Sequence, residues 1–308
     1  MSRWWLGAIA LVAMVSAIPA AAEVCGTVSF TSPSAVSGWN PLTTSTGTTS
    51  FTATVTRAAR STRTAQIIFL DKDSGPTALG SVGTQIGPDY AVRWGSTLVS
   101  APAGTILPPT SSAAAEYSWN GNESLNVGKS ASFAVTVQSR GNQEFVGNTS
   151  YVETLRYALR CFQASGGPET TDTVGNAVTV TLAVPSLLSV TTAAPSPIDF
   201  GSFTSTTANT AIGLRSTASV VVRVTTLYGS QLVKAGAVAP YPANMAIPYT
   251  MNFNGVTVTT SASATNLPRA KVVGSSWPFV LTLVGGLPAG KVAGDYADTI
   301  TLTMTPGI

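Results

Sequence analysis

The last segment of the chain constrains the fold most, because it alternates strictly between apolar and hydroxyl side chains. Ile300, Leu302 and Met304 share one face, and four threonines from Thr299 to Thr305 occupy the other. Alternation with a period of two is typical of a strand with one buried face. No further segment follows that could pair with this strand. We therefore expect it to lie beside an open position in its sheet.

Similar patterns recur along the chain at short intervals, between turns rich in Gly and Pro. Only 9% of the residues are charged, and β-branched residues, which favour strands, are abundant. This spacing predicts an all-β fold of two immunoglobulin-like β-sandwich domains. The expected strands are 25–30, 51–56, 64–70, 132–138, 151–161, 174–184, 187–191, 219–225, 231–238, 247–253, 256–260, 278–284 and 299–305.

The N-terminus has the pattern of a secretory signal peptide. Arg3 precedes a short apolar run, and 20–22 are small residues suited to cleavage. We expect the mature protein to begin at Glu23 and to be exported. A boundary near Pro185 then predicts an N-terminal domain over 23–184 and a C-terminal domain over 185–308. A boundary at the 166–168 turn is the alternative.

Cys25 and Cys161 are the only cysteines. In an exported chain a single pair predicts one disulfide, here within the N-terminal domain. A redox or metal pair would need neighbouring partners that the sequence does not provide. We therefore expect no metal site and no cofactor.

Several function classes are disfavoured by composition. The net charge is only +3, and the sequence has no clusters of Lys and Arg. Both observations argue against nucleic acid as a partner. The sequence has no histidine, so a Ser-His-Asp or Cys-His site is excluded and an enzyme is not expected. Asp71 opens a segment like a calcium loop, but Val82 stands where that loop requires glutamate.

Large apolar side chains gather in turn-rich parts of the N-terminal domain. Two interpretations stay open: they cover the ends of the sandwich as core, or they form an exposed surface for binding. Long loops such as 71–128 are often functional. The candidate surface-binding residues are Trp39, Leu42, Tyr90, Trp94, Tyr117 and Trp119.

Two motifs in the C-terminal domain resemble a known family. The first is Pro197-Ile198-Asp199-Phe200-Gly201, followed by the apolar run 219–224, and the second is Gly294-Asp295-Tyr296-Ala297-Asp298-Thr299 before the last strand. Both resemble spore coat protein U-type domains. A weaker copy, with Glu153-Thr154 in place of Asp298-Thr299, lies in the N-terminal domain. The C-terminal domain departs from the family in lacking a cysteine.

The resemblance implies a two-domain tip adhesin of archaic (Csu-type) chaperone–usher pili. Subunits of this kind are sandwiches without their last strand. A periplasmic chaperone fills the gap first, and the N-terminal strand of the adjacent pilin subunit then replaces it at the outer-membrane usher. The groove residues expected here are Ile300, Leu302, Met304, Val220, Val222 and Val224.

The resemblance further implies attachment to an abiotic or host surface, biofilm formation and a place at the pilus tip. Cys25 would be the third residue of the mature chain, so we expect the subunit to accept a strand but to have none to donate. The alternative is a structural spore-coat or cell-surface protein that uses the same domains without adhesion.

Overall fold

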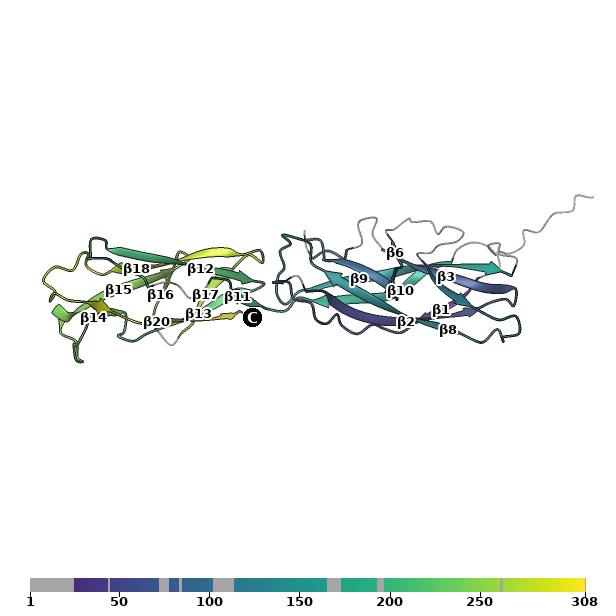
Figure 1. Cartoon of the computed structure of the whole chain (residues 1–308), viewed down its shortest axis with the longest axis horizontal. Coiled ribbons are helices and arrows are strands. Elements are labelled where there is room, and N and C mark those ends of the chain that lie inside the picture. Colours follow the sequence, from purple (N-terminus) through teal and green to yellow (C-terminus); the bar gives the residue numbers. More distant parts are fainter. Residues whose placement is uncertain are drawn as a thin grey trace, which may run out of the picture.

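The computed structural model describes residues 25–307 except 44, 72–77, 83–84, 102–113, 165–172, 193–196 and 261–262. The predicted signal peptide (1–22) and parts of the predicted 71–128 loop therefore lie outside the described residues. The described remainder of that segment is not a plain loop, because it contains four short strands between residues 89 and 118. The described chain is all-β, apart from one short 3-10 helix, η1 (Ala243–Met245). Two elongated β-sandwiches lie end to end, and the chain ends beside their junction (Figure 1).

The N-terminal sandwich contains strands β1 to β10. One sheet has the order β1-β2-β8-β4-β5, and the other has the order β10-β9-β3-β6, with β7 also paired to β3. All pairings are antiparallel except that of β3 with β6. The bounds are β1 (Gly26–Phe30), β2 (Gly47–Arg57), β3 (Thr62–Leu70), β4 (Asp89–Trp94), β5 (Thr97–Leu98), β6 (Ser100–Ala101), β7 (Ala115–Ser118), β8 (Lys129–Gln138), β9 (Ser150–Gln163) and β10 (Thr173–Ala183).

The C-terminal sandwich contains strands β11 to β20. Its larger sheet has the order β11-β12-β18-β15-β14-β19, with β16 paired to β15, and its smaller sheet has the order β17-β13-β20. The bounds are β11 (Leu188–Val190), β12 (Thr207–Ser216), β13 (Ser219–Thr226), β14 (Gln231–Lys234), β15 (Ala246–Phe253), β16 (Val256–Val258), β17 (Thr265–Arg269), β18 (Ser275–Leu283), β19 (Tyr296–Ala297) and β20 (Ile300–Pro306).

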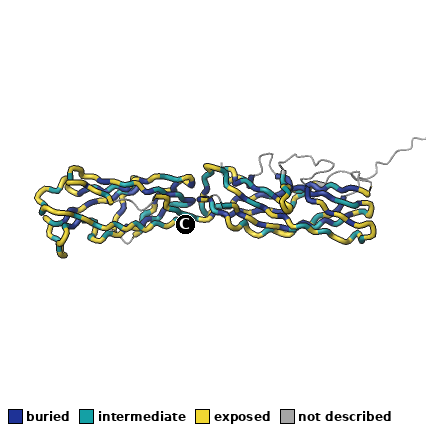
Figure 2. The backbone as a smooth tube through the Cα atoms, in the orientation of Figure 1, coloured by how far each residue is buried: buried dark blue, intermediate teal, exposed yellow. Residues whose placement is uncertain are grey.

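Each sandwich has its own hydrophobic core. Buried positions follow the strands, whereas exposed positions concentrate in the loops at the ends (Figure 2). In the N-terminal core, Phe51, Phe69 and Phe133 contact one another with ring centroids 4.9 to 5.4 Å apart. The all-β prediction is confirmed, because alternating side chains from both sheets meet between them.

The predicted disulfide is also confirmed. Cys25 and Cys161 are bonded, with Cα atoms 5.5 Å apart. The bond ties the residue before β1, in one sheet, to β9 in the other. It therefore joins the two layers of the N-terminal sandwich across its core.

Several strands were not predicted. β12 places Ala208, Ile212 and Leu214 in the core, but glycine and polar residues between them dilute the apolar pattern. β17 contains Pro268 and buries only Leu267, which suits the edge strand that it is. No described helix is long and apolar enough to cross a membrane.

Candidate functional site

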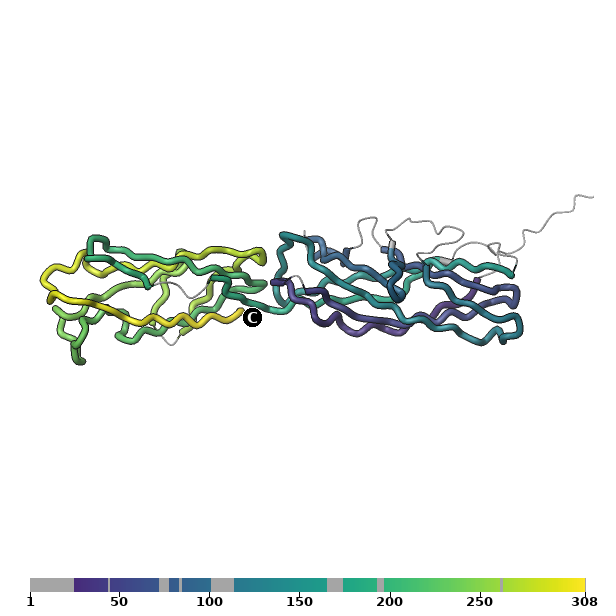
Figure 3. The backbone as a smooth tube through the Cα atoms, in the orientation of Figure 1, coloured from purple at the N-terminus to yellow at the C-terminus, as the bar shows by residue number. Residues whose placement is uncertain are grey.

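The last strand, β20, lies at the edge of its sheet. It pairs antiparallel with β13, with Leu302 opposite Val224 and Met304 opposite Val222. Figure 3 shows it running from the outer end of the C-terminal sandwich back to the junction. No strand in the described part of the chain pairs with its other side.

The hydrogen bonds at both ends of β20 fix which backbone groups face that open side. Leu227 N–H donates to the carbonyl oxygen of Thr299 at 3.0 Å, and Gly307 N–H donates to Ser219 at 2.6 Å. Residue pairs that exchange hydrogen bonds alternate along an antiparallel ladder. The odd-numbered residues of β20 therefore bond β13. The N–H and C=O groups of Ile300, Leu302 and Met304 point to the open edge.

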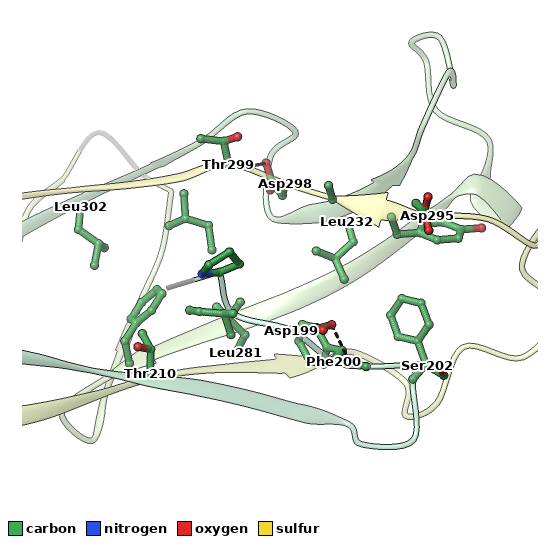
Figure 4. A pocket seen from close by; sticks show the side chains of 18 of the residues that line it. Asp199, Phe200, Ser202, Thr210, Leu232, Leu281, Asp295, Asp298, Thr299 and Leu302 are labelled. Atoms are coloured by element: carbon green, nitrogen blue, oxygen red, sulfur yellow. Dashed lines mark hydrogen bonds between the residues drawn. The ribbon is translucent and has the colours of Figure 1, made fainter. Parts of the chain in front are cut away.

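A groove of about 830 Å³ with an apolar floor lies beside this edge. In Figure 4 the β20 segment with Thr299 and Leu302 borders it on one side, and Thr210 on β12 borders it on the other. Its floor is the inner face of the larger sheet, formed by buried side chains of β12, β14 and β18. These are Ile212, Leu232, Phe279 and Leu281.

The structure corrects the predicted groove residues. It brings all six together on β13 and β20, but only Ile300 and Leu302 line the groove. Val220, Val222 and Val224 are almost fully buried, because β13 lies one strand inward from the edge and its valines already belong to the core. Met304 lies nearer the junction, beyond the groove.

The segment from Pro197 to Phe203 also lines the groove. Asp199 accepts a hydrogen bond from Gly201 N–H at 2.7 Å, and Gly201 has a φ of 60°. This turn directs Phe200 into the core and places Phe203 against Tyr296, with ring centroids 5.9 Å apart. The residues form one of the two motifs noted in the sequence. The motif could have drawn attention to this side of the groove. Its sequence pattern alone, however, did not show that these residues face a groove.

Asp298 anchors the chain just before β20. Its carboxylate accepts hydrogen bonds from Tyr228 N–H at 3.1 Å, Thr299 N–H at 2.7 Å and the hydroxyl of Tyr249 at 2.7 Å. Burial, and secondarily the bond to Asp298, raises the pKa of Tyr249 above its ordinary value of 10.0. The motif aspartate therefore positions β20 and has no geometry that suggests catalysis.

The N-terminal sandwich has a strand where the C-terminal one has the groove. There β10 pairs with the outer side of β9, so β9 is not an edge. Val178, Val180 and Leu182 of β10, with Val184 after it, are buried in the core. The chain thus contains one sandwich that is closed by its own strand and one that is open at the equivalent position.

The predicted surface-binding residues need a second correction. Five of the six are buried in the N-terminal core: Trp39, Leu42, Tyr90, Tyr117 and Trp119. The indole N–H groups of the two tryptophans find internal acceptors, Ser139 for Trp39 and the Val127 carbonyl for Trp119, both at 3.1 Å. These side chains cover the sandwich as core, which was the other interpretation. Only Trp94 is exposed, at 37%.

No metal-binding cluster is present among the described residues. They contain no group of three Asp, Glu or Cys side chains that could hold a metal ion. Asp71, at the start of the calcium-loop-like segment, is buried and accepts a hydrogen bond from Ala78 N–H at 3.3 Å.

Comparisons with known proteins give only distant likenesses. No protein-family model matches the chain. No curated protein matches it. One similar solved structure is the CsuC–CsuE chaperone–tip adhesion subunit pre-assembly complex from the archaic chaperone–usher Csu pili of Acinetobacter baumannii. The identity is 12% and the TM-score 0.36, over 82% of this chain and 88% of that chain.

A second similar structure is a chaperone–tip adhesin complex described for the activation of CFA/I fimbriae biogenesis. Here the identity is 12% and the TM-score 0.30, over 91% of this chain and 84% of that chain. At these values neither likeness carries a conclusion about function, which has to rest on the geometry of the groove.

Proposed function

We propose that this protein is the tip adhesin subunit of an archaic chaperone–usher pilus, exported and non-enzymatic. Its C-terminal sandwich accepts a strand from another protein, first a periplasmic chaperone and then, at the outer-membrane usher, the adjacent pilin subunit. The supporting observation is the unpaired edge of β20 above a groove with an apolar floor, at the position that β10 fills in the N-terminal sandwich. The spore coat protein U-like motifs agree with this role.

The energetics favour such an acceptor. An inserted strand with four apolar side chains would gain roughly 6–12 kcal/mol from burial, as an upper bound. It would also pair the backbone groups of Ile300, Leu302 and Met304, which the described strands leave at an edge. Since whole domains are stable by only about 5–15 kcal/mol, the C-terminal sandwich should depend strongly on its partner.

The position of the N-terminal sandwich favours one direction for the inserted strand. β20 runs from the outer end to the junction (Figure 3). A strand antiparallel to it, as β10 is to β9, would run outward. An N-terminal extension inserted in this direction puts the body of its subunit beyond the outer end, clear of the N-terminal sandwich.

Peptide binding tests the acceptor role. Peptides matching the N-terminal extensions of pilin subunits from the same genome should raise the melting temperature of the C-terminal sandwich. A control peptide with two of its apolar residues replaced by aspartate should not. If no extension stabilises the protein, it is not a strand acceptor.

The adhesive part of the proposal falls on the N-terminal sandwich, whose outer end lies at the opposite end of the molecule from the C-terminal sandwich (Figure 1). With the other aromatic candidates buried, Trp94 is the remaining one. Trp94→Ala should reduce attachment of piliated cells to a hydrophobic or host-cell surface and reduce biofilm, with pilus assembly unchanged. Leu227→Ala, an exposed apolar residue of the C-terminal sandwich, is the matched control. Equal attachment by both variants would exclude Trp94 as a contact.

The burial of five of the six surface-binding candidates favours one alternative, a structural coat or cell-surface protein without adhesive role. Immunogold labelling separates the two functions. A tip adhesin is labelled at the ends of fibres, whereas a coat protein is labelled evenly over the surface.

A further inference from the structure

The segment that connects the two sandwiches is itself held in place by hydrogen bonds. The N–H of Leu187 donates to Oγ1 of Thr217 at 2.8 Å, and this hydroxyl donates to the carbonyl oxygen of Pro185 at 2.7 Å. Thr217 N–H in turn donates to the carbonyl of Leu187 at 3.0 Å. Thr217 is fully buried. The connection therefore has no free length that could act as a hinge.

A second contact brings the β8–β9 loop against the same turn. Gly147 N–H donates to the carbonyl oxygen of Thr217 at 2.6 Å. A Cβ atom on Gly147 would lie 2.9 Å from Oγ of Ser186 and 3.3 Å from Oγ1 of Thr217. A larger residue at this position would therefore have to move the Ser186 hydroxyl and would crowd the Cα atom of Ser186, at 3.2 Å.

A third contact is centred on Glu144, also in the β8–β9 loop. Both oxygens of its carboxylate lie 3.1 Å from the N–H of Val272, in the β17–β18 loop of the other sandwich. Nη1 of Arg269 lies 3.5 Å from Oε2 of Glu144 and donates to the carbonyl oxygen of Phe145. Hydrogen bonds to a charged group are stronger than those between neutral groups.

The apolar core also crosses the junction. Val272 belongs to the C-terminal sandwich in sequence, yet its side chain is buried in the core cluster of the N-terminal one. Phe145 is fully buried there, with its ring centroid 5.0 Å from that of Trp39. Rotation of one sandwich against the other would expose Val272 and break the bonds of Thr217 and Glu144 together.

From these contacts we propose that the junction is a rigid clamp, with Glu144 as its central positioning residue, and that the two sandwiches form a single stiff rod. Domains in one chain move against each other unless their interface is extensive and well packed. Here the linker, two loops and a shared core all resist that motion. The clamp holds the outer end of the N-terminal sandwich at the opposite end of the molecule from the C-terminal sandwich. It does not depend on what occupies the groove.

Rotational diffusion tests the clamp. Backbone ¹⁵N relaxation of the full mature chain should fit one elongated diffusion tensor for both sandwiches. Glu144→Ala should give each sandwich its own tensor, with a correlation time roughly 1.5-fold shorter, as expected for smaller bodies on a tether. Amide spectra report whether both sandwiches remain folded.

Glu123→Ala is the matched control, because Glu123 also accepts a backbone N–H bond, from Asn120, and pairs with a cation, Lys129, but within one sandwich. It should tumble like the wild type. Should Glu144→Ala not fold, Glu144→Gln, which loses the charge that strengthens the bond to Val272 and pairs with Arg269, should shorten the correlation time in the same direction. Separate tensors in the wild type, or wild-type tumbling of the folded Glu144 variant, would overturn the proposal.

Discussion

The two sandwiches of this protein share most of their strand order, and the difference that bears on function is one strand, β10. The order β1-β2-β8-β4-β5 corresponds to β11-β12-β18-β15-β14, and β7-β3-β9 corresponds to β17-β13-β20. Beside β9 lies β10, and beside β20 lies the groove. The N-terminal sandwich therefore shows how the C-terminal one would be arranged with a strand in its groove.

The difference teaches where each sandwich obtains its stability. In the N-terminal one, the apolar side chains of β10 complete the core from within the same chain. In the C-terminal one, Ile212, Phe279 and Leu281 face a space that no described strand fills. We therefore expect the first sandwich to be stable alone and the second to respond to an added strand.

The largest expected effect comes from a charge on the closing strand. Val180 of β10 is fully buried, so Val180→Asp should destabilise the N-terminal sandwich by about 4 kcal/mol or more, because an unpaired charge would enter its core. Thr181 is the matched control, since it faces solvent and Thr181→Asp should cost less than about 0.5 kcal/mol. Urea unfolding followed by tryptophan fluorescence measures both. Equal costs would mean that β10 does not close the core.

The next largest effect is expected from removal of the disulfide, which should destabilise only one of the two sandwiches. Replacement of Cys25 and Cys161 by serine should destabilise the N-terminal sandwich by about 2–5 kcal/mol, because the unfolded chain gains freedom. The C-terminal sandwich contains no cysteine and should keep its melting temperature. Calorimetry of the full chain resolves the comparison, and a parallel loss in both sandwiches would refute it.

A smaller effect is expected at the anchor of β20. Tyr249→Phe removes the hydrogen bond to Asp298 and should cost the C-terminal sandwich about 1.5–3 kcal/mol. The pKa of Tyr249 is raised in the folded state, so the folded chain keeps its proton when the unfolded chain loses it. The contribution of Tyr249 to stability should therefore be constant below pH 10 and fall as the pH rises above it. The variant should lack the part of this alkaline loss that comes from Tyr249, as pH-dependent unfolding can show.

The sequence predicted those parts of the fold that have strong alternation. β2, β8, β9, β10, β13 and β20 show it, β3 was recognised instead as a continuous apolar run, and β20 indicated an open edge. The side of the groove opposite β20 could not be predicted in the same way. β12 fills its inward positions partly with small residues such as Ala208, and the Pro197–Phe203 segment has no regular period.

The aromatic residues show a different limit of sequence reasoning. Trp39 and Trp119 stand among turn residues, which normally indicates a surface position. The structure folds both loops back, so that the rings are buried and each indole N–H finds an acceptor. Whether a loop turns inward depends on contacts distant in sequence, which local pattern does not encode.

Residue-resolved amide hydrogen exchange on β20 tests the central claim most directly. In the free protein, the amides of Leu302 and Met304 should exchange much faster than those of Thr303 and Thr305, which bond β13. A bound donor-strand peptide should slow the first pair and leave the second unchanged. Equal protection of all four in the free protein, or no slowing with any stabilising peptide, would contradict an open strand-accepting edge.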